Sequence, residues 1–341
     1  MNSKQTTSTP LRFAHIGAGR MAKRWIQVIQ KNKNASLVAI VDAGSGKAAE
    51  LAATIPGCKG TSDITEVLTD TSIDAIIVST SHQYLSEVTN KALVAGKHVL
   101  CEKPGAIQAK DLQKTIELAN KGKRTYMVGY NHRFHDGFLK ARELFDKGSI
   151  GELIFIRASY GFGGRKGYDT EWRLNPEKSG GGHLIDQGVH MIDLCLSYIG
   201  EPTEIKGMMS DLFWKKGAED NAFVLLKGEK NTIASIHTSL TQWDPMHRFE
   251  IYGTLGYLVI HGLGKKYGGG EKLLVGTRLD DYSGATEVVI ECDRDADQSL
   301  THELDEFISA ISEAREVSPS PLAALKTLSV VETLYKNSQH L

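Results

Sequence analysis

The feature that most constrains this chain is a glycine turn near its N-terminus, Gly17-Ala18-Gly19-Arg20-Met21-Ala22. It follows a short apolar run, Leu11–Ile16, and precedes a segment, Met21–Gln30, whose apolar residues recur at helical spacing. A G-x-G-x-x-A sequence between a buried strand and a helix is typical of a dinucleotide-binding turn, where glycine backbone approaches a pyrophosphate at the helix N-terminus. The alternative is a structural glycine turn.

A second apolar strand, Leu37–Val41, ends in Asp42. A carboxylate at this position accepts hydrogen bonds from the adenosine ribose and repels a 2′-phosphate. The sequence therefore predicts NAD as the cofactor and disfavours NADP, although Lys47 is near and Asp42 has the alternative of being a solvated surface group. The cofactor residues predicted from the turn and the acid are Gly17, Gly19, Arg20, Met21 and Asp42.

Further apolar runs at Ala75–Val78, His98–Cys101 and Thr125–Val128 alternate with helical sequence as far as Gly129. Near-continuous apolar strands separated by helices predict a parallel sheet that is covered on both faces. We therefore expect a doubly wound α/β domain of the Rossmann type at 11–129, preceded by a flexible polar tail at 1–10.

After Gly129 the segments are longer and alternate partly between apolar and polar residues, which predicts an antiparallel sheet with one open face. These segments are Leu153–Tyr160, Glu204–Met209, Ala222–Leu226, Thr232–His237, Phe249–Tyr252, Tyr257–Ile260 and Glu287–Glu291. A strongly apolar helix is expected at 183–199. Helices near 301–312 and 321–336 close the chain and are candidates to pack back on the first domain. We predict an α+β domain at 130–341 for substrate binding and oligomerisation.

Composition excludes several classes of protein. The 341 residues carry 40 Lys and Arg against 41 Asp and Glu, and 41% are hydrophobic, which argues against disorder and against a broad nucleic-acid surface. No apolar run is long enough for a transmembrane helix, and the polar head does not resemble a signal peptide. The scattered cysteines favour reduced thiols and a cytoplasmic location; they are Cys58, Cys101, Cys195 and Cys292.

Two groups are candidates for the chemistry. Lys103, in Glu102-Lys103-Pro104, follows an apolar strand at the sheet edge where ligands bind, and its ammonium group could stabilise a developing alkoxide. Asp186 and His190 stand four apart in the apolar helix, so a carboxylate could orient a histidine for proton transfer. The alternatives are a surface ion pair for the lysine and a structural hydrogen bond for the pair. Together with His183, Asp186 and His190 have a spacing that resembles a set of metal ligands, but we predict no metal site here.

The order GAGRMA, VDAG, GKHVLCEKP, GYNHRF, WR and SGGGHLIDQGVHMIDL resembles the glucose–fructose oxidoreductase/inositol dehydrogenase/rhizopine-catabolism (Gfo/Idh/MocA) family from Leu11 onward. The resemblance implies a Rossmann domain followed by an α+β domain with a large open, mostly antiparallel sheet. It also implies NAD(P)-dependent oxidation or reduction of a sugar, a polyol or a related carbonyl. The implied catalytic and substrate-binding residues are Lys103, Asp186 and His190.

The same resemblance implies that Trp172 and Arg173 approach the cofactor from the second domain and that Arg133 lies near the substrate pocket. Further cofactor contacts are expected from Thr80, Glu102 and Lys103. The chain departs from the family after the strand that ends near Thr80. There it has Thr80-Ser81 where relatives often have Thr-Pro, and Leu85 where they have a histidine.

Many possible cations flank the expected pocket and are compatible with a phosphorylated or nucleotide-linked sugar. They are His132, Arg133, His135, Arg165, Lys166, Arg173, His247 and Arg248. The alternative is that most are solvated or paired. Tyr160, Trp172 and Trp243 could stack on a sugar ring, or belong to the core. The glycines at 180–182 predict a close backbone approach before the helix.

We therefore expect hydride transfer between a nicotinamide and a sugar, polyol or nucleotide-linked sugar. Neutral His190 would take the hydroxyl proton, Lys103 would hold the oxygen and Asp186 would orient His190. One alternative is a glycoside hydrolase that recycles bound NAD, and another is a non-catalytic NAD- or sugar-binding regulator. The open sheet face predicts a homodimer or homotetramer, and no nucleic acid or membrane partner is expected.

Overall fold

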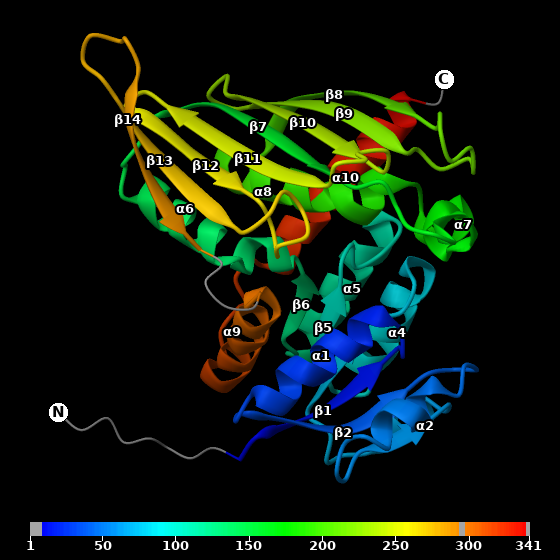
Figure 1. Cartoon of the computed structure of the whole chain (residues 1–341). Helices are drawn as coiled ribbons and strands as arrows, with labels where there is room; N and C mark the ends of the chain where they lie inside the picture. The colour runs from blue at the N-terminus through cyan, green and yellow to red at the C-terminus, as the bar shows by residue number, and fades with distance from the viewer. Residues whose placement is uncertain (1–8, 293–296, 339–341) are drawn as a thin grey trace, which may run out of the picture. The chain divides into compact units, whose positions relative to one another are not determined.

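The computed structural model describes residues 9–292 and 297–338, so the tail expected at 1–10 lies outside the described residues except for Thr9 and Pro10. The chain divides into two compact units (Figure 1). The first contains the chain up to Ala106, Lys110–Gly129 and Leu300–Pro321. The second contains Ile107–Ala109, Tyr130–Ser299 and the chain from Leu322. Each unit has a sheet of its own.

The first unit is built on sheet A, whose six strands are all parallel and lie in the order β3-β2-β1-β4-β5-β6. The strands are β1 (Leu11–Ile16), β2 (Ala35–Val41), β3 (Lys59–Thr61), β4 (Ala75–Val78), β5 (His98–Glu102) and β6 (Tyr126–Gly129). Every residue of 13–16 is buried, so both faces of β1 are covered. The predicted doubly wound α/β fold is confirmed.

Helices of the first unit connect and flank these strands: α1 (Arg20–Lys31), α2 (Lys47–Ala52), α3 (Thr65–Thr69), α4 (His82–Val94), α5 (Ala109–Gly122) and α9 (Ser299–Glu313). Helix α9 comes from far along the chain, and Phe307 on it contacts Phe13 of β1 with ring centroids 6.3 Å apart. Strand β3 was not predicted, because three residues that include a glycine carry no periodicity.

The second unit is built on sheet B, with the strand order β14-β13-β12-β11-β7-β10-β9-β8. Its strands are β7 (Leu153–Gly161), β8 (Pro202–Ser210), β9 (Asn221–Gly228), β10 (Ile233–Ser239), β11 (Met246–Gly253), β12 (Gly256–His261), β13 (Lys272–Arg278) and β14 (Ala285–Glu291). Neighbouring strands are antiparallel except β10 and β7, which are parallel. The sheet is mixed and mostly antiparallel, as the resemblance implied.

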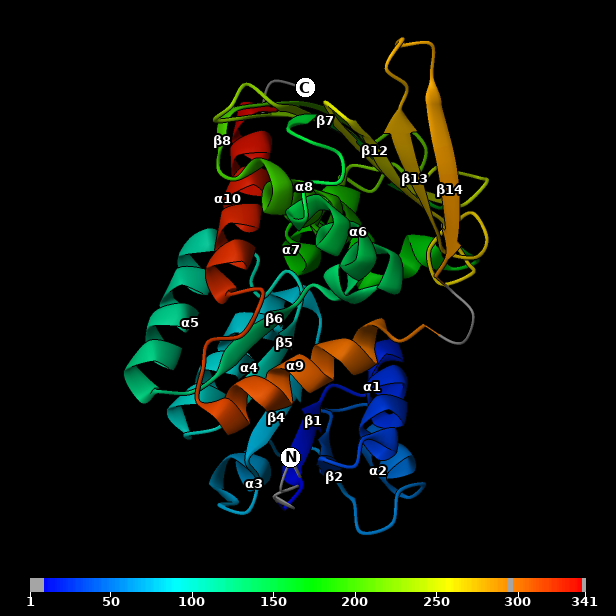
Figure 2. The same cartoon turned by 90° about the vertical axis from the view of Figure 1, so that its left-hand side faces the viewer.

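Helices lie against one face of sheet B, among them α6 (Asp136–Asp146), α8 (Val189–Ile199) and α10 (Pro321–Asn337), as Figures 1 and 2 show. On β9 the residues that face these helices are buried, whereas the alternate residues Phe223 and Leu225 are 56% and 51% exposed. This alternation is that of a sheet with one covered and one open face. Among the described residues, the helices are too short or too polar to cross a lipid bilayer.

Arg133 fastens the short 3-10 helix η1 (Asn131–Phe134) to α8. Its Nε donates to Asp193 Oδ2 at 2.6 Å, and its Nη2 donates to Asp193 Oδ1 at 2.7 Å and to the Asp193 carbonyl at 3.2 Å. The Asp193 side chain is 1% exposed, so it depends on Arg133 in place of water. This bidentate pair fixes the segment that contains His132 and precedes His135 against α8.

We predict that Arg133→Ala lowers the free energy of unfolding by about 3–5 kcal/mol, because it leaves a buried carboxylate without its cation. The matched control is Lys91→Ala, since Lys91 pairs with Glu87 on the surface of α4 with side chains 51% and 58% exposed. The control should change stability by less than about 0.5 kcal/mol. Urea unfolding of the two variants measures the difference, and equal losses would refute a structural role for the buried pair.

Candidate functional site

The turn between β1 and α1 requires glycine at its first position. Gly17 has a φ of +106°, and a Cβ there would lie 2.8 Å from the Ser79 carbonyl oxygen on the neighbouring strand. Gly19 is the residue before α1, and no described atom lies within 4 Å of the position a Cβ would take. The space beside Gly19 at the N-terminus of α1 is therefore open, which fits a pyrophosphate there.

Asp42 lies where β2 ends and contacts the same turn. Its Oδ1 accepts a hydrogen bond from the Ala18 amide at 2.9 Å, and its Oδ2 accepts one from the Ser45 hydroxyl. Asp42 thus joins the second strand to the glycine turn. The predicted residues Arg20 and Met21 open helix α1 next to this turn. The geometry of the turn, the helix N-terminus and the acid fits a bound dinucleotide.

Two further predicted cofactor positions follow neighbouring strands of sheet A. Thr80 comes after β4, and Glu102 ends β5 directly before Lys103. The indole Nε1 of Trp25 donates to Glu102 Oε1 at 2.9 Å, which fixes this carboxylate. Helix α9 adds Glu303, a fully buried residue whose pKa is raised well above the ordinary value by burial and then by the negative charge of Glu102. Burial therefore favours the protonated form of Glu303 at this edge.

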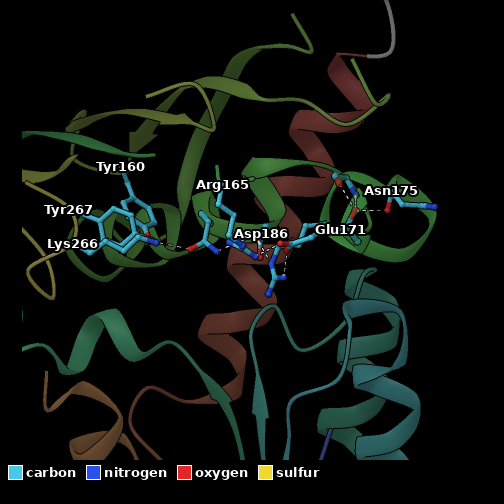
Figure 3. Close-up of polar contacts among 11 residues, drawn as sticks. Tyr160, Arg165, Glu171, Asn175, Asp186, Lys266 and Tyr267 are labelled. Carbon is cyan, nitrogen blue, oxygen red and sulfur yellow. Dashed lines mark hydrogen bonds and ion pairs between the residues drawn. The ribbon is translucent and has the colours of Figure 1, made fainter. Parts of the chain in front are cut away.

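In the second unit, a polar network surrounds Asp186 (Figure 3). Arg173 Nε lies 3.4 Å from Asp186 Oδ2, and Gln187 Nε2 donates to the same oxygen at 3.1 Å. Arg173 also pairs with Glu171 at 3.1 Å, while the hydroxyl of Tyr160 donates to Gln187 Oε1 at 3.3 Å. Asp186 itself is buried. A cation and an amide donor therefore both favour its carboxylate form.

The expected regular helix at 183–199 is wrong in its first turn. Leu184–Gly188 forms a π-helical turn, and the α-helix α8 begins only at Val189. Gly188 packs closely here: a Cβ would lie 2.9 Å from Leu184 and 3.1 Å from Thr238 of β10. Because a π turn bonds i to i+5, Asp186 and His190 do not have the regular i,i+4 spacing that the sequence suggested.

His190 lies in a cluster of buried rings. It stacks on His132 with centroids 3.8 Å apart and planes 10° apart, and the ring of Tyr130 meets it edge-on at 5.8 Å. His247 contacts His132 at 5.7 Å, and its pKa is lowered to about 3 by burial and by the positive charges of His135 and of a neighbouring histidine.

Most of the possible cations already have carboxylate partners. Arg133 pairs with Asp193 in the bidentate manner described above. The other pairs are Arg165 with Glu171, Arg173 with Glu171 and Asp186, Arg248 with Glu250 at 3.0 Å, and His135 with Glu271 at 2.8 Å. The positive charge that the sequence suggested is therefore largely balanced by carboxylates.

The predicted aromatic residues have different environments. Tyr160 is buried, and Trp243 is 62% exposed, with its ring 4.8 Å from Phe213. The Arg173 guanidinium lies over the Trp172 ring at 4.6 Å. Among residues 9–292 and 297–338, no cluster of three or more His, Cys, Asp or Glu side chains could hold a metal ion.

Several residues of the site carried no usable sequence signal. Glu303 stands among unrelated neighbours in the sequence, and only the fold brings it to Glu102. Gln187 directly follows Asp186, but its side-chain hydrogen bond to that residue has no pattern of its own. His132 was noted as a possible cation, and its stacking on His190 joins two distant segments. Such contacts between distant segments have no spacing that a sequence pattern can reveal.

The chain matches two family profiles. The first, described as the oxidoreductase family with an NAD-binding Rossmann fold (GFO_IDH_MocA), matches residues 11–130. The second, described as the GFO/IDH/MocA C-terminal domain, matches residues 138–259. Among curated proteins, the inositol 2-dehydrogenase of Rhizobium meliloti is 26% identical over 338 residues, which cover 96% of each chain.

Solved structures share the fold. A levoglucosan dehydrogenase in complex with NADH superimposes with a TM-score of 0.85 at 21% identity, over 97% of this chain and 98% of that chain. A 3-ketoreductase from Actinomadura kijaniata, in complex with NADP and TDP-benzene, gives a TM-score of 0.83 at 19% identity, also over 97% and 98%. These TM-scores show a common fold.

Proposed function

The chain belongs to the GFO/IDH/MocA oxidoreductase family, and on that premise we propose that it transfers hydride between a nicotinamide cofactor and a CH–OH carbon of a sugar or polyol. The observation that carries this proposal is the burial of an acid and a base four residues apart: Asp186, which lies 3.4 Å from the guanidinium of Arg173, and His190, which stacks on His132. The cofactor turn at Gly17 supports the same chemistry.

We assign cofactor binding to 11–129 and substrate binding and oligomerisation to 130–341. When bound, the nicotinamide supplies the hydride acceptor or donor. The chain supplies the groups that handle the substrate oxygen and its proton: the Lys103 ammonium holds the oxygen by charge and hydrogen bonding, and neutral His190 takes the proton. Asp186 favours the protonated form of His190 as the proton arrives. In our proposal Trp172 and Arg173 contribute to the cofactor side, and Arg133 acts by holding α8.

The charge balance of the second unit favours an uncharged substrate. A phosphate-binding pocket needs cations that are available to the ligand, whereas Arg133, Arg165, Arg173 and Arg248 all have carboxylate partners. A neutral polyol such as an inositol or a neutral sugar matches this balance better than a phosphorylated or nucleotide-linked sugar. The relative named as an inositol 2-dehydrogenase supports the same choice.

The four cysteines are free thiols, which supports our proposal of a cytoplasmic location.

We predict that Lys103→Ala and His190→Ala lower kcat by about 10²- to 10⁴-fold on a neutral sugar or polyol, because each removes a group that acts on the oxygen or its proton. A screen of free, phosphorylated and nucleotide-linked sugars that follows NADH absorbance identifies the substrate first. Lys91→Ala, on the exposed surface of α4, is the control and should keep native turnover. Near-native turnover in either site variant would refute the assignment.

The same screen separates the alternatives, because it follows sugar products as well as absorbance. Release of a sugar with no net NADH would identify the glycoside hydrolase that recycles its cofactor. Tight NAD binding with no turnover of any sugar would identify the non-catalytic regulator. Oxidation of a sugar with stoichiometric NADH is the expected result.

We propose NAD rather than NADP because Asp42 places a negative charge where a 2′-phosphate would lie, at the end of β2 beside the turn. Asp42→Ser should shift the ratio of kcat/KM values for NAD and NADP toward NADP by about ten- to a hundredfold, since it removes charge repulsion and a charged hydrogen-bond acceptor. Asp63→Ser, which alters an exposed acid that bonds the Thr65 amide, should leave the ratio unchanged. A wild-type preference for NADP would contradict the proposal.

We also propose that the open face of sheet B is covered by a second copy of the chain. The exposed apolar side chains on strands β7 to β10 include Ile154, Met208, Phe223, Leu225 and Ile233. A contiguous apolar surface of this kind marks an association site. Along β9, exposed residues alternate with buried ones, so the exposed apolar side chains lie together on one face of the sheet.

The double variant Phe223→Glu/Leu225→Glu should be monomeric in sedimentation velocity at concentrations where the wild type is a dimer or tetramer. The added charges would lie at the interface and would lose their water there. The control Val94→Glu changes a residue that is 76% exposed on α4 and should keep the wild-type assembly. A wild-type monomer at every concentration would overturn the proposal.

A further inference from the structure

Glu219 binds three consecutive backbone amides immediately before the segment that carries Asp186. Its Oε2 accepts from the Gly182 amide at 2.8 Å, its Oε1 accepts from the Leu184 amide at 2.9 Å, and its carbonyl accepts from the His183 amide at 2.8 Å. Oε1 also accepts from the hydroxyl of Tyr335 on α10 at 2.8 Å. Two side chains from distant parts of the sequence thus fix one short stretch of backbone.

The glycines in this stretch are required by the same two side chains. Gly181 has a φ of +154°, and a Cβ there would overlap the hydroxyl of Tyr335. A Cβ on Gly182 would overlap the backbone of Glu219. The close approach expected at 180–182 is therefore an approach to Glu219 and Tyr335. Any larger residue would move the backbone away from the carboxylate.

We propose that Glu219 and Tyr335 are positioning residues that hold Gly182–Leu184 and thereby set the orientation of Asp186. The connection is direct, because the Asp186 amide donates to the Gly182 carbonyl at 3.1 Å. This inference rests on the proposed function, in which Asp186 orients His190. Neither residue was a candidate from the sequence, and neither is assigned a contact with substrate or cofactor.

The ionisation of Glu219 adds a testable property. Burial raises the pKa of its carboxyl group to about 7, although hydrogen bonds from Tyr335 and from the amides of Leu184 and Gly182 oppose this increase. Of the titratable groups nearby, Tyr335 faces it directly, His183 packs its ring against Phe162, and Asp220 accepts from other backbone amides. Protonation gives the carboxyl group an O–H that competes with one of its three donors.

The raised pKa of Glu219 also determines how this residue affects the free energy of unfolding at different pH values. A carboxyl group whose pKa is raised in the folded state contributes stability below its ordinary pKa of 4.5, and loses that contribution as the pH rises through about 7. Ionised Glu219 is therefore not favoured by global stability at pH 8. Its three hydrogen bonds give it a local role, which is to order Gly182–Leu184.

Hydrogen–deuterium exchange of a peptide spanning 180–192 tests the inference without any substrate. In the wild type, protection corrected for intrinsic rates should rise as the pH decreases through about 7, because the closed segment binds the Glu219 proton more tightly than an opened, water-exposed segment does. Tyr335→Phe removes one donor to the carboxylate, so the midpoint should move up by about half to one pH unit. Glu219→Gln should remove this pH dependence. The control Glu250→Gln, which alters a buried ion-paired acid on β11, should leave this peptide unchanged.

Kinetics on the identified substrate provide the second readout. In Tyr335→Phe, the fall of kcat on the acid side of its pH profile should occur at a higher pH than in the wild type. The plateau of kcat at high pH and the affinity for NAD should stay close to native. Glu219→Gln should lower kcat by about 10²-fold through misplacement of Asp186. Unchanged exchange and an unmoved midpoint in Tyr335→Phe would overturn the inference. An enzyme that shows the predicted exchange but turns over no sugar would instead refute the proposed function.

Discussion

The contact between the Gly182 backbone and Glu219 is the constraint on which the Asp186 segment of the second unit depends. The chain passes so close to the carboxylate and to Tyr335 that only glycine fits at 181 and 182. From this point the backbone makes a π-helical turn and enters α8, whose residues are almost all buried beneath sheet B. Asp186 and His190 therefore come from a rigid segment that is tied to two distant parts of the chain.

The sequence was sufficient to predict the first unit because each of its strands is a nearly continuous apolar run and its turn has a motif with a physical requirement. Gly17 has the positive φ and the close contact that a dinucleotide turn needs, and Asp42 does contact that turn. Partial alternation was also enough to predict most strands of sheet B. Strand β13 was missed because Gly276 and short polar neighbours interrupt its pattern.

The remaining features depend on contacts between distant segments. The π turn at 184–188 packs Gly188 closely on Thr238, and no periodicity in the helix sequence reveals that contact. The stacking of His132 on His190, the hydrogen bonds of Glu219 to the backbone amides and the burial of Glu303 beside Glu102 likewise require the fold. The ion pairs could not be predicted from the sequence either. The arginines could be named as possible cations, but the carboxylates that pair with them could not.

The central claim is that this site moves hydride and proton on a neutral sugar or polyol. The most direct measurement incubates the protein with NADH that carries deuterium at both positions of nicotinamide C4 and with the ketone of the identified substrate, and analyses the product by mass spectrometry. The account predicts one deuterium bound to carbon in the alcohol product, lost when His190 is replaced by alanine. An unlabelled product, or release of a sugar without oxidation of the cofactor, would contradict it.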